Sequence, residues 1–175
     1  KWDVIRNCLA YIENMQRASV QLVVLQNYKN MNREAPLVRN FVRNTYHRVA
    51  DTLGVERYQS VPLYLPGDTL VPERYGRDGT LACLRGMEGS FDRIFPITLE
   101  DEWLVPRRYL KRLDDSTAFN HVVFVDRLDQ NITTLERVDK GHWKIRSMNP
   151  ATTGRHAPPY AQETPLGMYL LQQKK

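Results

Sequence analysis

Few side chains in this sequence could act as a nucleophile or as its base. The sequence holds two cysteines, Cys8 and Cys83, and four histidines, His47, His121, His142 and His156. A cysteine thiolate attacks a carbonyl carbon well when a neighbouring histidine lowers the pKa of the thiol. Neither cysteine has a histidine beside it in the sequence, so we predict that both are buried free thiols. A disulfide between them would need an oxidising compartment and a close approach of their Cα atoms, which the spacing does not establish.

The same residue types do not form a metal-binding motif. The cysteines lack a Cys-x-x-Cys spacing, and no pair of histidines has the spacing of ligands on one helix or hairpin. We therefore expect no metal and no cofactor. His47, His121 and His142 are predicted to be ordinary surface or half-buried residues, which leaves His156 as the histidine nearest to a distinctive motif.

That motif lies between residues 149 and 169. It contains Thr153-Gly154-Arg155 and, after a proline-rich insertion, Thr164-Pro165-Leu166-Gly167-Met168-Tyr169. Pro165 favours an extended residue before it, and Gly167 permits a positive φ or a close approach of two backbone segments. Arg155 and His156 could line a cleft and bind a carboxylate. A plain loop followed by a strand would also explain each of these residues taken singly.

Residues 119–175 together resemble the first part of the catalytic domain of the L,D-transpeptidase family. The strands, the Thr-Gly pair and the Thr-Pro-x-Gly-x-Tyr run carry this resemblance. In that family a β-rich domain cross-links peptidoglycan. The resemblance implies a substrate cleft, for which the candidate residues are Gly154, Arg155, His156, Thr164, Pro165, Gly167 and Tyr169.

The chemistry that the resemblance implies is acyl transfer through a cysteine thioester. A thiolate attacks the donor stem peptide at the carbonyl between an L-configured centre and a D-residue, and an amine of a second stem then takes the acyl group. The family places this cysteine in a Ser-His-Gly-Cys-x-Arg type segment, which this sequence lacks, so we name no catalytic residue. We expect an incomplete part of a periplasmic or cell-envelope enzyme. Its expected partners are peptidoglycan stem peptides and the remainder of the same protein.

The elements that must position these residues are predicted to form an α+β fold in three parts. Residues 1–54 are predicted to form a helical hairpin, because apolar residues recur at helical spacing over 2–30 and again over 37–53. Pro36 suits the first turn of the second helix, and Gly54 suits its end.

Residues 55–113 are predicted to form a small closed or half-closed β-barrel. Glycines and prolines separate short runs of β-forming residues, which we expect to be strands over 60–65, 80–85, 91–98 and 102–105, with a helical turn over 106–110. Closing short strands into a barrel avoids long exposed edges. The order resembles an SH3-like barrel, with Val61-Pro62-Leu63-Tyr64 as its opening strand and Asp101-Glu102-Trp103-Leu104-Val105 near its end.

The polar stretch 114–120 separates this barrel from the truncated L,D-transpeptidase-like domain, residues 119–175. Strand-like runs over 121–126, 132–138 and 143–148, with a turn over 139–142, predict an antiparallel meander. Because only the leading strands are expected, the sheet should keep an open edge that pairs with a partner chain or with the remainder of the same protein.

The charge pattern and the hydropathy of the sequence argue against nucleic-acid binding and against a membrane-spanning segment. The formal net charge of +5 suits an anionic partner. However, the arginines alternate with acids, and no basic helix or zinc-ligand spacing is present, so we predict no nucleic-acid binding. No apolar run is long enough to span a bilayer. The alternative to an enzyme is a non-catalytic module whose SH3-like barrel and basic surface bind cell-wall polymer or a protein. A cysteine flanked by glycine and arginine in an extended sequence would favour the enzyme.

Overall fold

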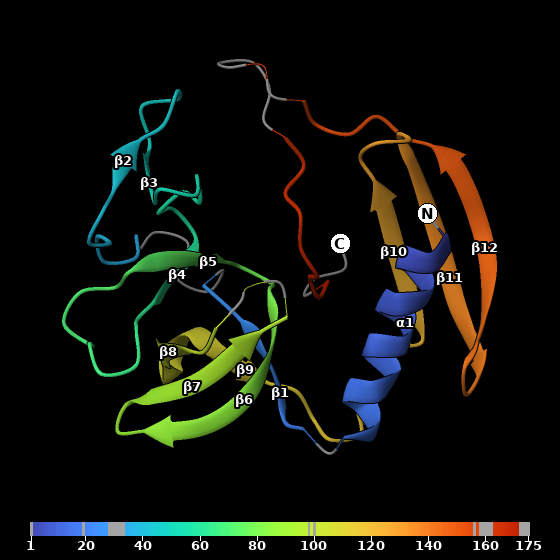
Figure 1. The fold of residues 1–175 in the computed structure, drawn as a ribbon, viewed down its shortest axis with the longest axis horizontal. Coiled ribbons are helices and arrows are strands. Elements are labelled where there is room, and N and C mark those ends of the chain that lie inside the picture. Colours follow the sequence, from blue (N-terminus) through green and yellow to red (C-terminus); the bar gives the residue numbers. More distant parts are fainter. Residues whose placement is uncertain are drawn as a thin grey trace. The chain divides into compact units, whose positions relative to one another are not determined.

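The computed structural model describes residues 2–18, 20–27, 34–97, 99, 101–155, 157 and 163–171. These residues form one α-helix, a short 3-10 helix and twelve β-strands (Figure 1). The chain divides into two compact units. The first unit comprises residues 1–20 and 115–165, and the second comprises residues 21–114 and 166–175. Each unit has its own sheet and its own apolar core.

The first unit is a three-stranded antiparallel meander with one helix packed on it. The strands are β10 (His121–Asp126), β11 (Asn131–Asp139) and β12 (His142–Pro150), in the order β10-β11-β12. The helix α1 (Trp2–Arg17) lies across one face of this sheet (Figure 1). The predicted meander is therefore confirmed, with strand ends that differ by a few residues.

Apolar residues at helical spacing fix the contact between α1 and the sheet. Ile5 and Leu9 are buried against Leu135 of β11, and side chains from the neighbouring strands pack around them. These neighbours are Val122, Phe124 and Trp143. Alternation along β10 turns Val122 and Phe124 toward the helix and leaves Val123 and Val125 exposed, as a strand covered on one face requires.

A buried glutamate ties the end of α1 to the turn between β11 and β12. Glu13 is 8% exposed. Its Oε1 accepts hydrogen bonds from the Trp143 indole nitrogen (2.9 Å) and from the Gly141 backbone N–H (3.1 Å). Its Oε2 pairs with Arg17, one turn later, at 3.1 Å. A buried carboxylate with three donors is well satisfied, so Glu13 has a structural role.

The second unit is built on a five-stranded antiparallel sheet in the order β8-β7-β6-β1-β9. Its strands are β1 (Leu22–Leu25), β6 (Leu81–Glu88), β7 (Phe91–Pro96), β8 (Trp103–Pro106) and β9 (Leu110–Arg112). The 3-10 helix η2 (Arg107–Tyr109) joins β8 to β9. Two small ribbons complete the unit, β2 (Val42–Arg43) with β3 (Val49–Ala50) and β4 (Ser60–Leu63) with β5 (Arg74–Arg77). The predicted strands near 60, 80, 91 and 102 and the helical turn near 106 are confirmed.

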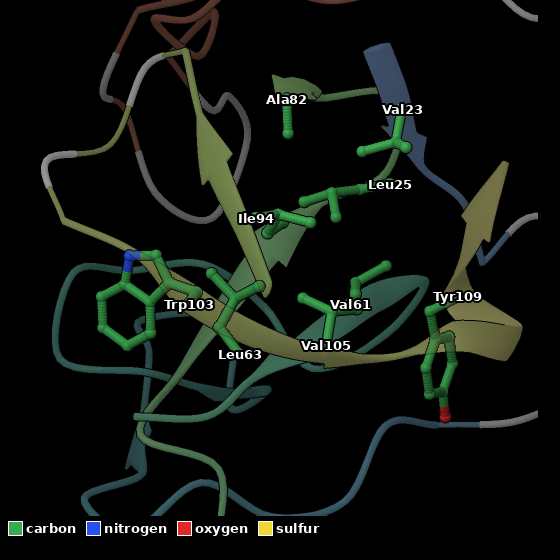
Figure 2. Packing of buried hydrophobic residues seen from close by; sticks show 9 residues of the cluster. All are labelled: Val23, Leu25, Val61, Leu63, Ala82, Ile94, Trp103, Val105 and Tyr109. Carbon is green, nitrogen blue, oxygen red and sulfur yellow. The ribbon is translucent and has the colours of Figure 1, made fainter. Parts of the chain in front are cut away.

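The core of the second unit lies between the large sheet and the β4–β5 ribbon (Figure 2). Its buried members come from both and from η2: Val23, Leu25, Val61, Leu63, Ala82, Ile94, Trp103, Val105 and Tyr109. Val61 and Leu63 are fully buried, so the ribbon covers the inner face of the sheet.

The predicted helical hairpin is wrong, because the described residues contain a single α-helix. The run Leu22-Val23-Val24-Leu25 forms β1, and all four of its side chains are buried. Four consecutive buried residues suit a central strand that is covered on both faces, whereas a helix would turn some of them to solvent. The β-branched valines also favour the extended backbone.

The second predicted helix, over residues 37–53, is replaced by the β2–β3 ribbon. In its turn, the Asn44 side-chain oxygen accepts hydrogen bonds from the Tyr46 and Arg48 N–H groups at 2.9 and 3.0 Å. His47, which lies between Tyr46 and Arg48, has a positive φ of 59°. Asp51 shapes the following loop in the same way, through hydrogen bonds to the N–H groups of Leu53 and Val55. Asparagine and aspartate side chains thus satisfy the backbone groups that a helix would have paired.

The predicted barrel is also wrong, because the described residues form no closed barrel, and these residues are mostly β rather than α+β, with 44% strand and 12% helix. In the part of the chain that the structure describes, the end strands β8 and β9 do not pair with each other. Tyr64 and Leu104 exchange two backbone hydrogen bonds of 2.9 Å, which bring the end of β4 to β8. Because the β4–β5 ribbon already buries the inner face, the sheet has a complete core without closing.

Among the described residues, none of the helices is long and apolar enough to cross a membrane.

Candidate functional site

The Thr-Gly part of the distinctive motif is anchored to the turn between β10 and β11. The Gln130 backbone oxygen accepts the Ala151 N–H at 2.9 Å, and its side-chain oxygen accepts the Thr153 N–H at 2.9 Å. The Gln130 amide group also donates to the Thr153 hydroxyl at 2.5 Å. These three hydrogen bonds fix the backbone that leaves β12 and leads to Gly154.

The Thr-Gly part and the Thr-Pro part meet within the first unit. The Gly154 N–H donates to the Thr164 hydroxyl oxygen at 2.9 Å. Arg127, in the same β10–β11 turn, forms an ion pair of 2.8 Å with Glu163, the residue before Thr164. The two predicted cleft residues Gly154 and Thr164 are therefore in direct contact, although ten residues separate them in the sequence.

The Gly-x-Tyr part of the motif belongs to the second unit, where it pairs with the chain before β6. The Leu170 N–H donates to the Gly79 oxygen at 2.9 Å, and the Leu81 N–H donates to the Met168 oxygen at 3.3 Å. Tyr169 forms an antiparallel bridge with Thr80 between these two bonds. The segment therefore forms an isolated β-bridge with the chain at the start of β6.

Gly167 allows Tyr169 to fold back on its own chain. Gly167 has a φ of +148°, and a Cβ at this position would lie 2.6 Å from the Tyr169 hydroxyl oxygen. The hydroxyl instead donates to the Leu166 oxygen at 2.9 Å. Burial raises the pKa of the Tyr169 hydroxyl, and the charge of Arg77 opposes this shift. The phenol therefore stays protonated as a hydrogen-bond donor.

The remaining predicted cleft residues are placed as follows. Arg155 and Pro165 are exposed. Among the described residues, no carboxylate forms an ion pair with Arg155. His156 lies outside the described residues. Of the other histidines, His47 lies in the β2–β3 turn rather than on a helix, and both His121 and His142 are exposed.

Sequence reasoning missed the residues that hold the motif together. Gln130 is the last residue of the turn that Asp126 begins, where the Asp126 side chain accepts hydrogen bonds from the N–H groups of Leu128 and Asp129 at 3.0 Å. An aspartate at this position favours a turn, so the turn itself could be predicted from the sequence. Nothing in the sequence marked Gln130 itself, whose contacts with Thr153 span 23 residues.

Neither cysteine has the lowered thiol pKa of a nucleophile. Cys83 is buried in β6, where burial raises the pKa of its thiol more than the charge of Arg85 lowers it. Cys8 is half-buried on α1, and burial raises the pKa of its thiol as well. Both thiols are therefore protonated at neutral pH, which is the unreactive form. The described residues also contain no group of side chains that could hold a metal ion.

An open pocket of about 570 Å³ in the first unit does not involve the described cleft candidates. It is lined by α1 and by residues around the end of β11. Several of the charged groups that line it have partners within the unit: Arg17 pairs with Glu13, Glu136 pairs with Arg146, and Arg137 donates to the Gln16 side-chain oxygen at 3.0 Å. This pocket therefore forms part of the contact between helix and sheet.

No family model, no curated protein and no solved structure matches this chain.

Proposed function

We propose that this chain is part of a bacterial cell-envelope L,D-transpeptidase, which cross-links peptidoglycan stem peptides through a cysteine thioester. The observation that carries the proposal is the hydrogen bond from Gly154 to Thr164. It joins the Thr-Gly pair to the Thr-Pro-x-Gly-x-Tyr run directly after a three-stranded meander, in the chain order that resembles the family. The proposal places the protein in the periplasm or cell envelope.

The polar contacts around Gln130 give this stretch a defined backbone, as one wall of a peptide cleft would need. The exposed guanidinium of Arg155 adjoins it and offers a planar donor for a stem-peptide carboxylate. In this proposal Gly154, Thr164 and Pro165, which all belong to the first unit, shape the cleft wall and perform no bond-making step.

The reaction has two acyl-transfer steps. A thiolate attacks the carbonyl carbon of the amide between an L-configured centre and a terminal D-residue, and the D-residue leaves as its protonated amine. The resulting thioester is attacked by an amine of a second stem peptide, which forms the new amide and releases the thiolate. Backbone N–H groups stabilise the oxyanion of each tetrahedral intermediate. Because the thiols of Cys8 and Cys83 are protonated and have no histidine partner among the described residues, the reaction in this proposal requires a cysteine outside these 175 residues.

Exchange of the terminal D-residue tests the proposal. The full-length protein that contains this sequence is incubated with a stem tetrapeptide and D-methionine, and the products are read by mass spectrometry. We expect D-methionine in place of the terminal residue, at an unchanged rate in the matched C8S/C83A double variant. Binding to purified peptidoglycan without any exchange would contradict the proposal and favour a non-catalytic wall-binding module.

A further inference from the structure

The β2–β3 ribbon of the second unit borders a pocket that is rich in arginine. The pocket has a volume of about 460 Å³ and is lined by Glu34, Arg43, His47, Arg48, Val49, Glu56, Arg57 and Tyr58. None of these residues belongs to the Thr-Gly or Thr-Pro motif, so what the pocket binds does not depend on the proposed transpeptidase function.

Two of the three arginines are held by glutamates. Arg48 pairs with Glu56 at 3.0 Å, and the other Glu56 oxygen accepts the Asn44 side-chain amide at 2.9 Å. Arg57 pairs with Glu34 at 2.7 Å and also donates to the Ala35 backbone oxygen at 2.5 Å. These contacts fix both guanidinium groups before any ligand arrives, which reduces the entropy that binding would cost.

The third arginine keeps an unbalanced charge. Arg43 donates to the His47 backbone oxygen at 3.2 Å, and among the described residues no carboxylate pairs with it. The contact orients the guanidinium and leaves its other N–H groups available. Three arginines against two glutamates leave one net positive charge at the pocket. One excess charge matches a carboxylate better than a phosphate monoester, which carries nearly two negative charges at neutral pH.

The pocket also offers an apolar surface beside the charge. The side chain of Tyr58 is 50% exposed at its wall. The volume is larger than a single carboxylate needs, and it falls within the range of small-molecule sites. A ligand with a carboxylate next to a ring or a short aliphatic part would use both features.

We propose that this pocket binds a monoanionic carboxylate carried by a small organic group, with Arg43 as the main donor. The carboxylate of a peptide end and that of an acidic sugar share this chemistry. In either case the ligand carboxylate accepts two parallel hydrogen bonds from the Arg43 guanidinium, and the rest of the ligand lies against Tyr58.

The test is a nuclear magnetic resonance titration of the whole chain with four probes. N-acetylalanine supplies a peptide carboxylate, glucuronate supplies a sugar carboxylate, N-acetylalanine methylamide lacks the charge, and inorganic phosphate carries a larger one. We expect saturable shifts of the Arg48, Val49 and Tyr58 amide resonances with one or both carboxylates. The tighter of the two identifies the source of the ligand. No saturable shift, equal binding of the methylamide, or tighter binding of phosphate would overturn the proposal.

Substitution of Arg43 separates the site from general charge effects. Loss of hydrogen bonds to a charged group should weaken carboxylate binding about tenfold or more in R43Q. The matched control is R6Q, which removes an exposed arginine of α1 and should leave the affinity unchanged. Because Arg43 is exposed and, among the described residues, donates only to a backbone oxygen, R43Q should keep the dispersed spectrum of the folded chain. An equal loss in both variants, or no loss in R43Q, contradicts the assignment.

Discussion

Different interactions stabilise the sheets of the two units. In the second unit, β1 is buried along its whole length, and Ile94, Leu63 and Val105 are fully buried around it (Figure 2). In the first unit, β12 has no buried residue, and its Ile145 and Met148 are each 44% exposed. The second unit therefore depends on apolar burial, whereas the first depends on one helix face and on a few buried polar contacts.

The difference follows from how many faces each sheet has covered. The β4–β5 ribbon lies over the inner face of the five-stranded sheet, so its side chains close a core. In the first unit α1 covers part of one face, and among the described residues β10 and β12 each pair with β11 alone. The open edge predicted from the sequence is thus present in the described part of the sheet. That it pairs with the remainder of the protein stays a prediction.

Truncation of a buried apolar side chain should have the largest effect, and it should destabilise the second unit more than the first. Ile94→Ala removes a fully buried side chain and should lower the free energy of unfolding of the second unit by about 4 kcal/mol. Leu135→Ala should lower that of the first unit by a smaller amount, about 2–3 kcal/mol, because its half-exposed neighbours can close over the gap.

Tryptophan fluorescence during urea unfolding can measure both effects in one chain. Trp103 lies in the second unit, whereas Trp2 and Trp143 lie in the first, so W103F and the W2F/W143F pair report on one unit each. Equal losses for the two alanine variants would contradict the difference in burial between the units.

Removal of the buried glutamate should affect the first unit alone. Glu13→Ala leaves the Trp143 indole nitrogen and the Gly141 N–H without their acceptor, which should cost about 2 kcal/mol. The midpoint for the second unit should not move. The matched control is W143F, which removes one of the donors and should cost less. A second-unit midpoint that falls with the first would show that the units unfold together.

Substitution of Gly167 should have the smallest effect and a local one. Gly167→Ala places a Cβ against the Tyr169 ring at an unfavourable φ, which should cost about 1–2 kcal/mol. The pairing of residues 168–170 with residues 79–81 should loosen, so hydrogen exchange at the Leu170 N–H should become faster. The control is G86A, since the space around Gly86 is open. Unchanged exchange in G167A would remove the role assigned to this glycine.

The sequence predicted the elements whose patterns are local. The strands of the meander and those near residues 60, 80, 91 and 102 alternate or cluster in ways that a strand requires, and all of them form. The failures came where pairing over long distances decides the structure. Leu22–Leu25 is a strand because it lies between β6 and β9, which are about sixty and ninety residues away. A window of sequence that contains only the preceding helix cannot show those neighbours.

The candidate site shows the same limit. The Thr-Gly and Thr-Pro parts could be singled out by residue type, and their contact through Gly154 and Thr164 links residues ten apart. The hydrogen bonds between Gln130 and Thr153 could not be predicted, because a glutamine in a turn does not indicate a partner 23 residues later. The arginine pocket was hidden for a different reason: the helix predicted over residues 37–53 would have placed Arg43 and Arg48 on a helix surface.

The central proposal is that this chain belongs to a cysteine acyltransferase and that neither Cys8 nor Cys83 is the nucleophile. The most direct test is acylation by a carbapenem, with the modified residue identified by mass spectrometry. Burial raises the pKa of both Cys8 and Cys83, so we expect neither to be acylated at neutral pH. In the full-length protein we expect one adduct, on a different cysteine. An adduct on Cys8 or Cys83, or no adduct on any cysteine of the full-length protein, would contradict the proposal.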